Sequence, residues 1–479
     1  MSLTREYTLA ASATTWGQLR GHLAGSQAER MAFGYCSAIS NLGKTRLLLH
    51  EVEFPTDGEY AVQHSARVVL SGRDTIPYLI RAKGAAAFLD AHSHPFPGVP
   101  HPSLTDNHSA ARQHASLQGP APGAALVRII SSADGRIWAG VQTGPEDPEP
   151  IRQVHILGRT GIEVIVPVNS TCDGSNAFRE MDRRTLACLG DGALSKTRGL
   201  AVGLIGVGGV GSMVARLLAS VVGELILVDP DHLEPSNAPR VWYAGTNSRG
   251  SKVGAARRAI RRAFPHLEVR SCVGSFPSRA TNNLLAGADF LFVCPDHNAV
   301  RFSASRFAAE NLLPLIEVGC GGRAVDRELS ALGYHVRLQV PGGPCLPCNG
   351  LDVSKLEDPS TTEAKKQHGY IEDGSEIAGE LAPLTTRAAA DAVDVFLRYC
   401  TGYSGTPPLH LYNDSLHLKT LDMTDSYSTQ PGCPACGATL RWPPTPLVGI
   451  TPSGHKGRHI PSARRESLRA PIANRDRNC

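Results

Sequence analysis

The chain has 479 residues, a formal net charge of +4 at pH 7, 42% hydrophobic residues and 19% charged residues. Its length exceeds that of one ordinary domain and its composition is globular, so we exclude a disordered chain and expect two domains. The small net charge gives no reason to expect a nucleic-acid or membrane partner. No run of about 18 apolar residues suits a membrane span and no signal-peptide pattern is present, so we expect a soluble cytoplasmic protein.

The first predicted region is an α/β domain over residues 1–150. It alternates short strands with helices, including a strand at Arg46–Val52 and a helix-like segment at Ala85–Asp90. The proline and acidic residues of Gly144–Pro150 disfavour both helix and strand, so they mark the end of this domain. We expect a linker over residues 151–175.

A second domain is predicted over residues 176–442, starting with a strand, a glycine-rich turn, a helix and another strand. The run Gly199–Gly211 leads into a helix to Ala219 and then into the strand Glu224–Asp229. This order is typical of a doubly wound parallel sheet. Later strands are expected at Phe290–Cys294 and Leu313–Val318. Residues 443–479 are rich in Pro, Ser and Arg, which predicts a disordered basic tail.

The segment Asp90–Asp106 places two histidines and one aspartate where they can share a metal ion. His92 and His94 are two residues apart on one face of an extended chain, and Asp106 follows His94 by twelve residues. Two imidazoles and a carboxylate form a catalytic zinc set whose fourth position is open to water. A surface loop that happens to contain two histidines is the alternative.

With Pro95 and Ser103 included, this segment resembles the JAMM (JAB/MPN) metalloprotease motif, H-[ST]-H-P followed by S-x-x-D. Eight residues separate His94 from Ser103, one more than in the family motif. The resemblance implies a JAMM α/β domain, deubiquitinase-like, that hydrolyses a peptide or isopeptide bond after the C-terminal residue of a ubiquitin-like protein. It assigns a catalytic zinc ion to His92, His94 and Asp106.

The same resemblance requires a glutamate on an early strand as general base for the zinc-bound water. Glu29 enters an apolar strand ahead of a glycine, as the family pattern asks. Glu51 and Glu53 lie on the following predicted strand and are the alternatives. We therefore predict Glu29 and Ser103 as the catalytic residues, with Ser103 donating a hydrogen bond to the developing oxyanion.

A glycine-rich run follows the first strand of the second domain and opens a helix. Its backbone N–H groups can approach a phosphate. The glycines are Gly206, Gly208, Gly209 and Gly211. Asp229 and Asp231 follow about 20 residues later, at the end of the next strand, where an acid binds a ribose. A dinucleotide-dependent oxidoreductase would show the same features, so further residues must decide.

The segments that follow resemble the ThiF/MoeB family and ubiquitin-activating enzymes, whose pattern is D-x-D, S-N-x-x-R, K and C-T-D-N. They are LVDPDHLEPSNAPRV, GSKVGAAR and FLFVCPDHNAVR. The resemblance implies a Rossmann-like adenylation domain that binds ATP: Asp231 holds the ribose, Asn237, Arg240 and Lys252 the triphosphate, and Asp296 a Mg²⁺ ion. Two cations and a metal spread the charge that develops when a carboxylate attacks the α-phosphate, and hydride transfer has no such need.

Three residues depart from this pattern, and one upstream arginine extends it. Val241 stands where many members have Gln, and Pro295 and His297 replace Thr and Asn, so altered nucleotide contacts are expected.

The motif REMDRR resembles the arginine motif with which the family reaches the ATP of a partner subunit. Arg183 is the best candidate for this ATP contact, and it implies a homodimer through the adenylation domain.

The twelve cysteines include two C-x-x-C pairs, which in a reducing compartment predict metal ligands before disulfides. The pairs are Cys345 with Cys348 and Cys433 with Cys436, and they resemble the structural zinc site of the same family. Four thiolates close a tetrahedral site and leave no position for chemistry.

No cysteine occurs from Asn349 to Tyr399, so we expect no thioester on that segment. The sequence does not identify the group that accepts the activated acyl group.

Together these motifs predict a fusion of a JAMM-type zinc metallopeptidase with a ubiquitin-like modifier adenylyltransferase. One domain would adenylate the C-terminus of a ubiquitin-like protein, and the other would trim or remove that protein. The expected partners are a ubiquitin-like or sulfur-carrier protein, a conjugating enzyme and a second copy of the chain. Two alternatives stay open: activation of a sulfur carrier for cofactor or cysteine synthesis, and a non-catalytic docking protein with a degenerate adenylation fold.

Overall fold

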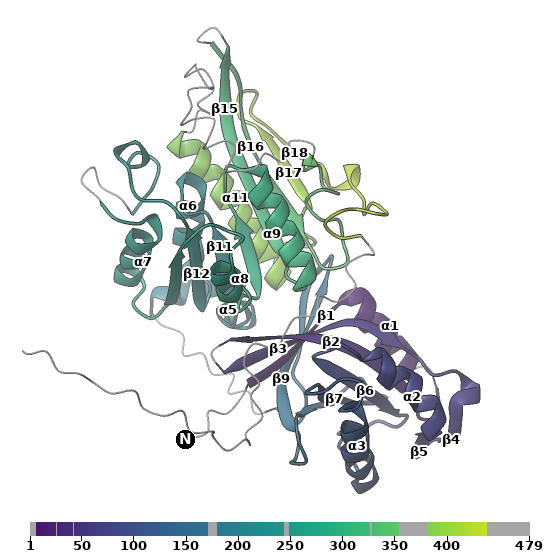
Figure 1. Cartoon of the computed structure of the whole chain (residues 1–479). Coiled ribbons are helices and arrows are strands. Elements are labelled where there is room, and N and C mark those ends of the chain that lie inside the picture. Colours follow the sequence, from purple (N-terminus) through teal and green to yellow (C-terminus); the bar gives the residue numbers. More distant parts are fainter. Residues whose placement is uncertain are drawn as a thin grey trace, which may run out of the picture. The chain divides into compact units, whose positions relative to one another are not determined.

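The computed structural model describes residues 6–24, 26–41, 43–170, 180–243, 249–325, 328–353 and 381–437. Within these ranges the chain forms two eight-stranded sheets and one two-stranded sheet. Figure 1 colours the chain along the sequence, so the strands of the first sheet are purple to blue and those of the second are teal to yellow. The fold is therefore mixed α/β, as predicted.

The first sheet is built from strands that precede residue 166. Its order is β1-β3-β2-β6-β7-β8-β9-β10, and β1 also pairs with β9, which closes the sheet on itself. The bounds are β1 Glu6–Ser12, β2 Met31–Asn41, β3 Lys44–Glu53, β6 Ala87–His94, β7 Ala125–Ser132, β8 Ile137–Gln142, β9 Glu149–Gly158 and β10 Gly161–Ile165. The strands β4 Tyr60–His64 and β5 Arg67–Leu70 form the two-stranded sheet.

Helices cover both faces of the first sheet. Helix α1 (Ala13–Ala24) packs on one face, while α2 (Gly72–Arg81) and α3 (Leu104–Leu117) pack on the other. Neighbouring residues of β6 enter the two cores, because Leu89 packs with α1 and Phe88 packs with α2 and α3. Burying side chains of this size contributes about 1.5–3 kcal/mol each, so β6 is held firmly from both faces.

Two predictions for this region are wrong. The segment Ala85–Asp90, predicted as a helix, lies mostly in β6, which pairs with β2 on one side and β7 on the other. A strand covered on both faces has a nearly continuous apolar run, which lacks the alternation of a half-exposed strand. The predicted linker, residues 151–175, instead contributes β9 and β10, because Ile151 and Val154 are fully buried in the sheet. The strand predicted at Arg46–Val52 is confirmed as part of β3.

The second sheet has the order β13-β12-β11-β14-β15-β16-β17-β18. Pairing is parallel from β13 to β15 and antiparallel from β15 to β18. The strands are β11 Ala201–Ile205, β12 Glu224–Asp229, β13 Glu268–Val273, β14 Phe290–Val293, β15 Leu315–Val325, β16 Glu328–Gln339, β17 His410–Asp414 and β18 Lys419–Asp422. The helices are α4 Arg183–Leu189, α5 Asp191–Arg198, α6 Gly209–Leu218, α7 Lys252–Ala263, α8 Arg279–Leu285, α9 Asn298–Glu310 and α11 Ala382–Thr401.

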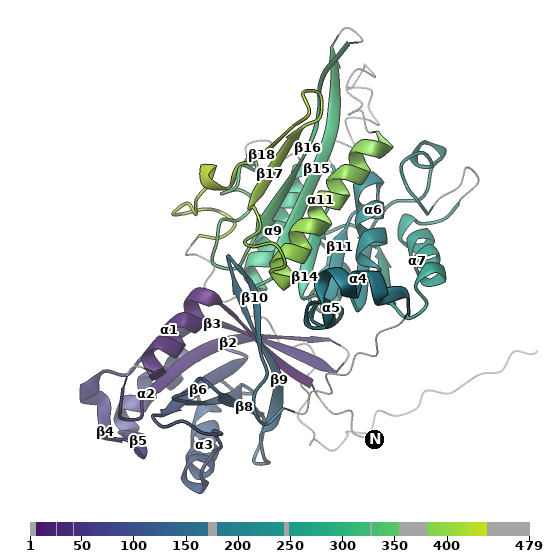
Figure 2. The same cartoon turned by 180° about the vertical axis from the view of Figure 1, so that it is seen from behind.

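The parallel half of this sheet is wound on both faces. Residues of α6, α7 and α11 share one core with the sheet, and residues of α8 and α9 share another. Figure 1 shows α9 in front of the sheet, whereas Figure 2, from behind, shows α11 in front. The predicted doubly wound arrangement is therefore confirmed, and the carboxyl ends of β11, β12 and β14 meet along one edge, where such sheets bind ligands.

Of the remaining predictions for this part of the chain, some are confirmed and one concerns residues outside the described ranges. The strand, turn, helix and strand predicted from Gly199 to Asp229 are present, as are strands at Phe290–Val293 and Leu315–Val325. The predicted tail, residues 443–479, lies outside the described residues. Among the helices that the structure describes, none combines the length and the apolar character needed to cross a membrane.

Candidate functional site

A glycine turn connects β11 to α6 at the edge of the second sheet. Gly206 has a φ of +87°, a left-handed conformation that favours glycine, and a Cβ there would lie 3.0 Å from the backbone of Cys294. A Cβ on Gly211 would lie 1.9 Å from the carbonyl oxygen of Gly206. The turn therefore needs glycine at position 206, and the start of α6 needs it at position 211. The turn presents the start of α6, whose first N–H groups have no partner within the helix.

The two aspartates predicted to bind a ribose have different surroundings. Asp229 is buried, and its carboxylate oxygens accept the N–H groups of Val207 and Asp231, each at 2.8 Å. Burial raises the pKa of Asp229, although those two hydrogen bonds oppose the shift. The side chain of Asp231 is 60% exposed, and its Oδ2 lies 2.7 Å from Nζ of Lys252. Asp229 therefore braces the turn, while Asp231 presents a carboxylate to solvent.

A cavity of about 330 Å³ lies over the turn and the adjoining strand ends. Its wall contains most residues predicted to bind ATP and Mg²⁺: Gly206, Gly208, Gly209, Asp229, Asp231, Asn237, Arg240, Lys252 and Asp296. The volume is at the lower end of the range of small-molecule sites, roughly 300–1,000 Å³. Residues that are up to ninety positions apart in the sequence thus meet at one opening.

Two residues of the predicted nucleotide set do not line this cavity. Gly211 lies within α6, where it lets the helix approach Gly206. Arg183 begins α4, and its side chain is 82% exposed, with Nη1 3.6 Å from a carboxylate oxygen of Glu180. The neighbouring Asp182 is buried and bonded to Arg198 at 2.8 Å, which fixes the start of α4. Arg183 therefore faces solvent and does not reach the cavity of its own chain.

Some residues of the cavity wall were missed. Arg301, Gly319 and Cys320 also line the wall, although the sequence motifs did not single them out. Arg301 lies in the first turn of α9 (Asn298–Glu310), five residues after Asp296, and this closeness in the sequence could have indicated it. Gly319 had no local signal, because its importance comes from His335, which packs against it from the neighbouring strand.

The two C-x-x-C pairs meet in one cluster. The Sγ atoms of all four cysteines lie within 4.8 Å of one another, and the distance from Cys345 Sγ to Cys433 Sγ is 3.4 Å. All four are free thiols, and Cys436 is less buried than the other three. Four sulfurs at this spacing make a possible metal site, and they suit a tetrahedral ion such as Zn²⁺.

A second group of possible metal ligands lies in the first sheet. His92 and His94 end β6, Asp106 lies in the first turn of α3, and one ligand atom of each lies within 4.8 Å of the others. Nε2 of His92 is buried without a hydrogen-bond partner, 3.8 Å from Oδ1 of Asp106. A buried nitrogen without a partner is costly, and a metal ion would satisfy it. Burial lowers the pKa of His92 to about 4, so its imidazole is neutral at pH 7, as metal binding requires.

Ser103 fixes Asp106 at the start of α3. The N–H group of Ser103 donates to Oδ2 of Asp106 at 2.7 Å, and the N–H group of Asp106 donates to Oγ of Ser103 at 3.1 Å. This reciprocal capping box satisfies two N–H groups at the helix start. Its consequence is that the helix holds the Asp106 carboxylate beside His92.

Glu29 is buried near the same group. It precedes β2 and is 7% exposed. Burial and the negative charge of Asp106 raise the pKa of Glu29 to about 7. The segment is tied to β6, because the N–H group of Arg30 donates to Oγ of Ser93 at 3.0 Å. A carboxyl group with this pKa can accept and return a proton near neutral pH.

The alternatives Glu51 and Glu53 lie on β3. Oε2 of Glu53 accepts a hydrogen bond from the Tyr35 hydroxyl at 2.8 Å, and its other oxygen pairs with Arg81. Glu51 is exposed. The geometry therefore favours Glu29 over both.

Two charged residues behind the His92 group were not predicted. Arg128 of β7 is buried, and its Nη1 donates to Oδ1 of Asn107, the residue after Asp106, at 2.9 Å. Asp90 lies opposite Arg128 in the β6–β7 register, and burial raises its pKa to about 6. These contacts depend on strands that are distant in the sequence, so no local pattern indicates them.

The match to a known protein family covers the second sheet and its helices. The ThiF family matches residues 182–435, more than half of the 479 residues. Molybdopterin-synthase adenylyltransferase of Salmonella typhimurium is 27% identical over 254 residues, which are 52% of this chain and 90% of the relative. Ubiquitin-like modifier-activating enzyme 5 of Caenorhabditis elegans is 31% identical over 217 residues, 43% of this chain and 48% of the relative.

Several of these matches span only part of the other protein. The same enzyme of Rattus norvegicus is 28% identical over 205 residues, which are 40% of this chain and 48% of the relative, so this chain spans about half its length. A solved structure of E. coli MccB with MccA-N7isoASN is similar with a TM-score of 0.44 and 20% identity, over 54% of this chain and 76% of that chain. The family match begins after residue 181 and does not include the His92 group.

Proposed function

Because the chain belongs to the ThiF family, we propose that its second sheet and helices form an ATP-dependent adenylyltransferase, which activates the C-terminal carboxylate of a ubiquitin-like or sulfur-carrier protein. The observation that carries this proposal is the cavity, whose wall gathers a glycine turn, Arg240, Lys252 and Asp296. The two cations can bind nucleotide phosphates, and the carboxylate can hold Mg²⁺. The N–H groups of the glycine turn can also approach a phosphate. The relatives' names support the direction of the proposal, since they include an adenylyltransferase and a modifier-activating enzyme.

Each residue has a distinct task in this proposal. Asp231 binds the ribose, and Asn237, Arg240 and Lys252 bind the triphosphate together with the N–H groups at the start of α6. Asp296 would hold Mg²⁺, which neutralises phosphate charge when bound. The substrate carboxylate attacks the α-phosphorus, the α–β anhydride bond breaks, and pyrophosphate leaves with the bonding electrons. The product is an acyl adenylate.

Binding of MgATP tests the nucleotide site directly. Calorimetry with the full chain should show one site for MgATP whose affinity falls when Mg²⁺ is chelated. Asp296→Asn should weaken binding of MgATP more than binding of metal-free ATP, because only the former uses its carboxylate. Asp425→Asn, at an exposed position far along the chain, is the control. A wild-type chain that does not bind MgATP would remove the basis of the proposal.

A docking role and sulfur-carrier activation are the two alternatives to protein modification. A docking protein with a degenerate fold would not need Arg240, Lys252 and Asp296 in one cavity, so their convergence favours catalysis. Sulfur-carrier activation and protein modification use the same adenylation step, and the neighbouring genes distinguish them. The segment from Asn349 to Tyr399 that lacks cysteine lies partly outside the described residues, so the absence of a thioester there stays a prediction.

We also propose a second activity, zinc-dependent peptidase action by the first sheet, because one observation favours it specifically. His92, His94 and Asp106 converge with an unpartnered imidazole nitrogen, and Glu29 lies close by with a raised pKa. The three ligands would hold Zn²⁺, which supplies a bound water of lowered pKa. Glu29 would take the proton from the attacking water and return it to the leaving amine, and Ser103 would donate to the oxyanion. The substrate would be a ubiquitin-like protein extended at its C-terminus.

Two further assignments belong to the same proposal. The four-cysteine cluster would hold a structural Zn²⁺ ion that ties the loop after β16 to the residues after β18. Arg183, exposed at the start of α4, would reach the cavity of a second copy of the chain and make a homodimer. Mixing an Arg183→Ala chain with an Asp296→Ala chain tests this, since one of the two composite sites would then be complete.

A further inference from the structure

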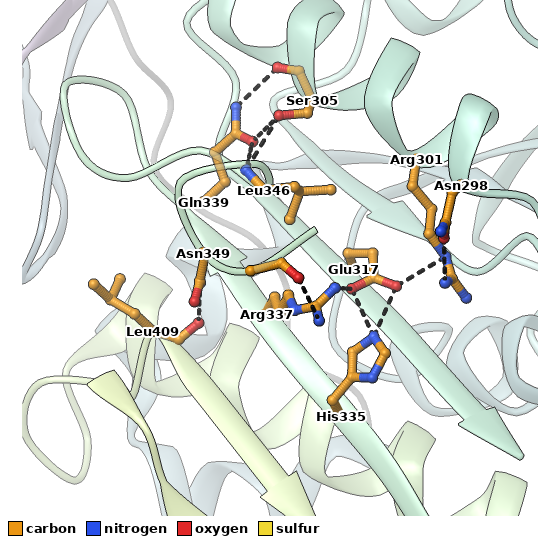
Figure 3. Close-up of polar contacts among 11 residues, drawn as sticks. Asn298, Arg301, Ser305, Glu317, His335, Arg337, Gln339, Leu346, Asn349 and Leu409 are labelled. Carbon is orange, nitrogen blue, oxygen red and sulfur yellow. Dashed lines mark hydrogen bonds and ion pairs between the residues drawn. The ribbon is translucent and has the colours of Figure 1, made fainter. Parts of the chain in front are cut away.

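Glu317 of β15 is a fully buried carboxylate among basic side chains (Figure 3). Its oxygens lie 3.0 Å from Nε of Arg301, 3.0 Å from Nε2 of His335 and 3.4 Å from Nη1 of Arg337. Burial opposes ionisation, but the charges of His335 and Arg301 and the hydrogen bond from His335 outweigh it and lower the pKa of Glu317 to about 2. Glu317 is therefore ionised at neutral pH.

This cluster holds more positive than negative charge. One carboxylate faces two guanidinium groups, which stay protonated in proteins. Their further acceptors are neutral, because Arg301 also donates to Oδ1 of Asn298 at 3.1 Å and Arg337 to the carbonyl oxygen of Gly350 at 3.4 Å. Since buried charge without compensation is costly, an anion beside this cluster would be stabilised.

Arg301 is the basic member of the cluster that lines the cavity over the glycine turn. Its side chain is only 15% exposed. Gly319 lines the same wall, and a Cβ there would lie 2.5 Å from Cε1 of His335 and 3.0 Å from Nη2 of Arg301. Glycine at position 319 therefore leaves room for both basic groups, and Arg301 lines the wall beside it.

The strand order separates Arg301 from the proposed phosphate-binding residues. Along the sheet the order is β12, β11, β14 and β15. Asp231 follows β12 and the glycine turn follows β11, whereas Arg301 follows β14 and Gly319 lies in β15. Asp296, which would hold Mg²⁺, also follows β14, so the phosphates would lie between the turn and Asp296. Arg301 and Gly319, beyond Asp296 toward β15, are then left for the second substrate.

We propose that Arg301 and Gly319 form a carboxylate subsite at this end of the cavity, and that Glu317 is the residue that positions Arg301. The proposal rests on the adenylation function proposed above, and it assigns the place of the acyl substrate. One oxygen of the substrate carboxylate forms the bond to the α-phosphorus as pyrophosphate leaves. Arg301 binds the other oxygen, which becomes the carbonyl oxygen of the acyl adenylate. No proton is transferred in this step.

Two synthetic compounds distinguish the subsite from the nucleotide site. One is 5′-O-sulfamoyladenosine, and the other carries an N-acetylglycyl group on the sulfamate, so it reproduces the carbonyl oxygen of a glycyl adenylate. Calorimetry with the full chain gives the dissociation constant of each. We expect the wild-type chain to bind the acylated compound at least about tenfold more tightly, the gain from one charge-assisted hydrogen bond.

Four variants test which residues create this preference. Arg301→Ala should abolish it while changing the affinity for sulfamoyladenosine by less than about threefold. Glu317→Gln keeps the shape but removes the charge that orients Arg301, so the preference should fall by a smaller factor. Arg301→Lys keeps the charge without the planar fork and should retain part of it. Arg306→Ala is the matched control, because Arg306 lies on the same helix and is half exposed.

Each other outcome contradicts the proposal in a recognisable way. An equal loss of affinity for both compounds in Arg301→Ala would place Arg301 in the nucleotide site, and an unchanged preference would give it no ligand role. A wild-type chain that binds sulfamoyladenosine without preferring the acylated compound would also overturn the subsite. A wild-type chain that binds neither compound nor MgATP would contradict adenylation itself. If Arg301→Ala does not fold, as shown by its thermal melting, Arg301→Lys and Glu317→Gln carry the test.

Discussion

Lys252 and Asp231 form an ion pair, with 2.7 Å between Nζ and Oδ2. The N–H group of Lys252 also donates to the carbonyl oxygen of Asp231 at 2.9 Å, so the start of α7 is attached to the end of the β12 loop at two points. The two residues proposed to bind opposite parts of one nucleotide are thus already in contact. The Asp231 side chain is 60% exposed, whereas that of Lys252 is only 13% exposed, so the ion pair holds the ammonium group at the cavity wall.

The first prediction concerns this pair. Lys252→Ala should weaken MgATP binding by roughly ten- to a hundredfold, because a hydrogen bond to a charged group contributes about 1.5–3 kcal/mol. Asp231→Ala should weaken it less, through the ribose alone. The measurement is calorimetry, and Lys419→Ala on the exposed strand β18 is the control. An unchanged dissociation constant in Lys252→Ala would remove Lys252 from the phosphate site.

The second prediction separates Asp229 from Asp231. Asp229→Ala should lower the free energy of unfolding by about 1–3 kcal/mol, because it leaves the buried N–H group of Val207 without a partner. Asp231→Ala should lower it by less than Asp229→Ala does, because the Asp231 side chain is 60% exposed and accepts no buried N–H group. Urea unfolding of both variants gives the comparison. Equal destabilisation would mean that Asp229 does not brace the turn.

The third prediction is a metal count. The purified wild-type chain should contain two zinc ions, one at the His92 group and one at the four-cysteine cluster. His92→Ala and Cys433→Ser should each lose one ion, measured by elemental analysis against protein concentration. Cys188→Ser, at an exposed free cysteine, should lose none. Retention of both ions in His92→Ala would show that the histidine group does not bind zinc.

The fourth prediction concerns Glu29. Glu29→Gln should retain zinc and lose cleavage of a ubiquitin-like protein carrying a C-terminal extension, because the glutamine cannot accept a proton. Cleavage by the wild-type chain should not require ATP, since water is the nucleophile. Glu51→Gln is the control and should cleave normally. Loss of zinc from Glu29→Gln would make Glu29 a ligand, and normal cleavage by it would exclude Glu29 as the base.

The fifth prediction uses the lowered pKa of Glu317. A carboxyl group whose folded pKa is about 2, below its ordinary value of 4.5, stabilises the fold fully above that ordinary value. The contribution is lost as the pH falls toward the folded pKa. Glu317→Gln should therefore be less stable than the wild-type chain at neutral pH, by about 3–5 kcal/mol. The difference should shrink when urea unfolding is repeated at about pH 3.5. A difference that does not depend on pH would indicate a packing defect.

From the sequence we predicted the parts of the sites whose residues lie close together along the chain. His92 and His94 lie on one strand, and Ser103 and Asp106 on one helix start, so a short motif contains most of that group. The glycine turn and the cysteine pairs are equally local. These features were predicted because their chemistry requires fixed spacing, whatever the packing around them.

The parts that were missed depend on pairing between distant strands. Glu317 meets His335 only because β15 and β16 pair in antiparallel register, and Arg128 meets Asp90 only because β6 pairs with β7. The strand β6 was predicted in part as a helix, since a strand buried on both faces shows no alternation. Strand β9 was predicted as part of a linker, because the prolines of Gly144–Pro150 occur just before it and at its start. They masked its buried apolar residues in the local pattern.

If this chain forms acyl adenylates, it should exchange labelled pyrophosphate into ATP. The full chain is assayed with Mg²⁺, ATP and a panel of ubiquitin-like and sulfur-carrier proteins that end in glycine. We expect exchange that requires one of these proteins and that disappears in Asp296→Ala. Undiminished exchange in Asp296→Ala would contradict the assigned metal ligand. Release of ADP and phosphate, with no label in ATP for any protein of the panel, would contradict adenylation.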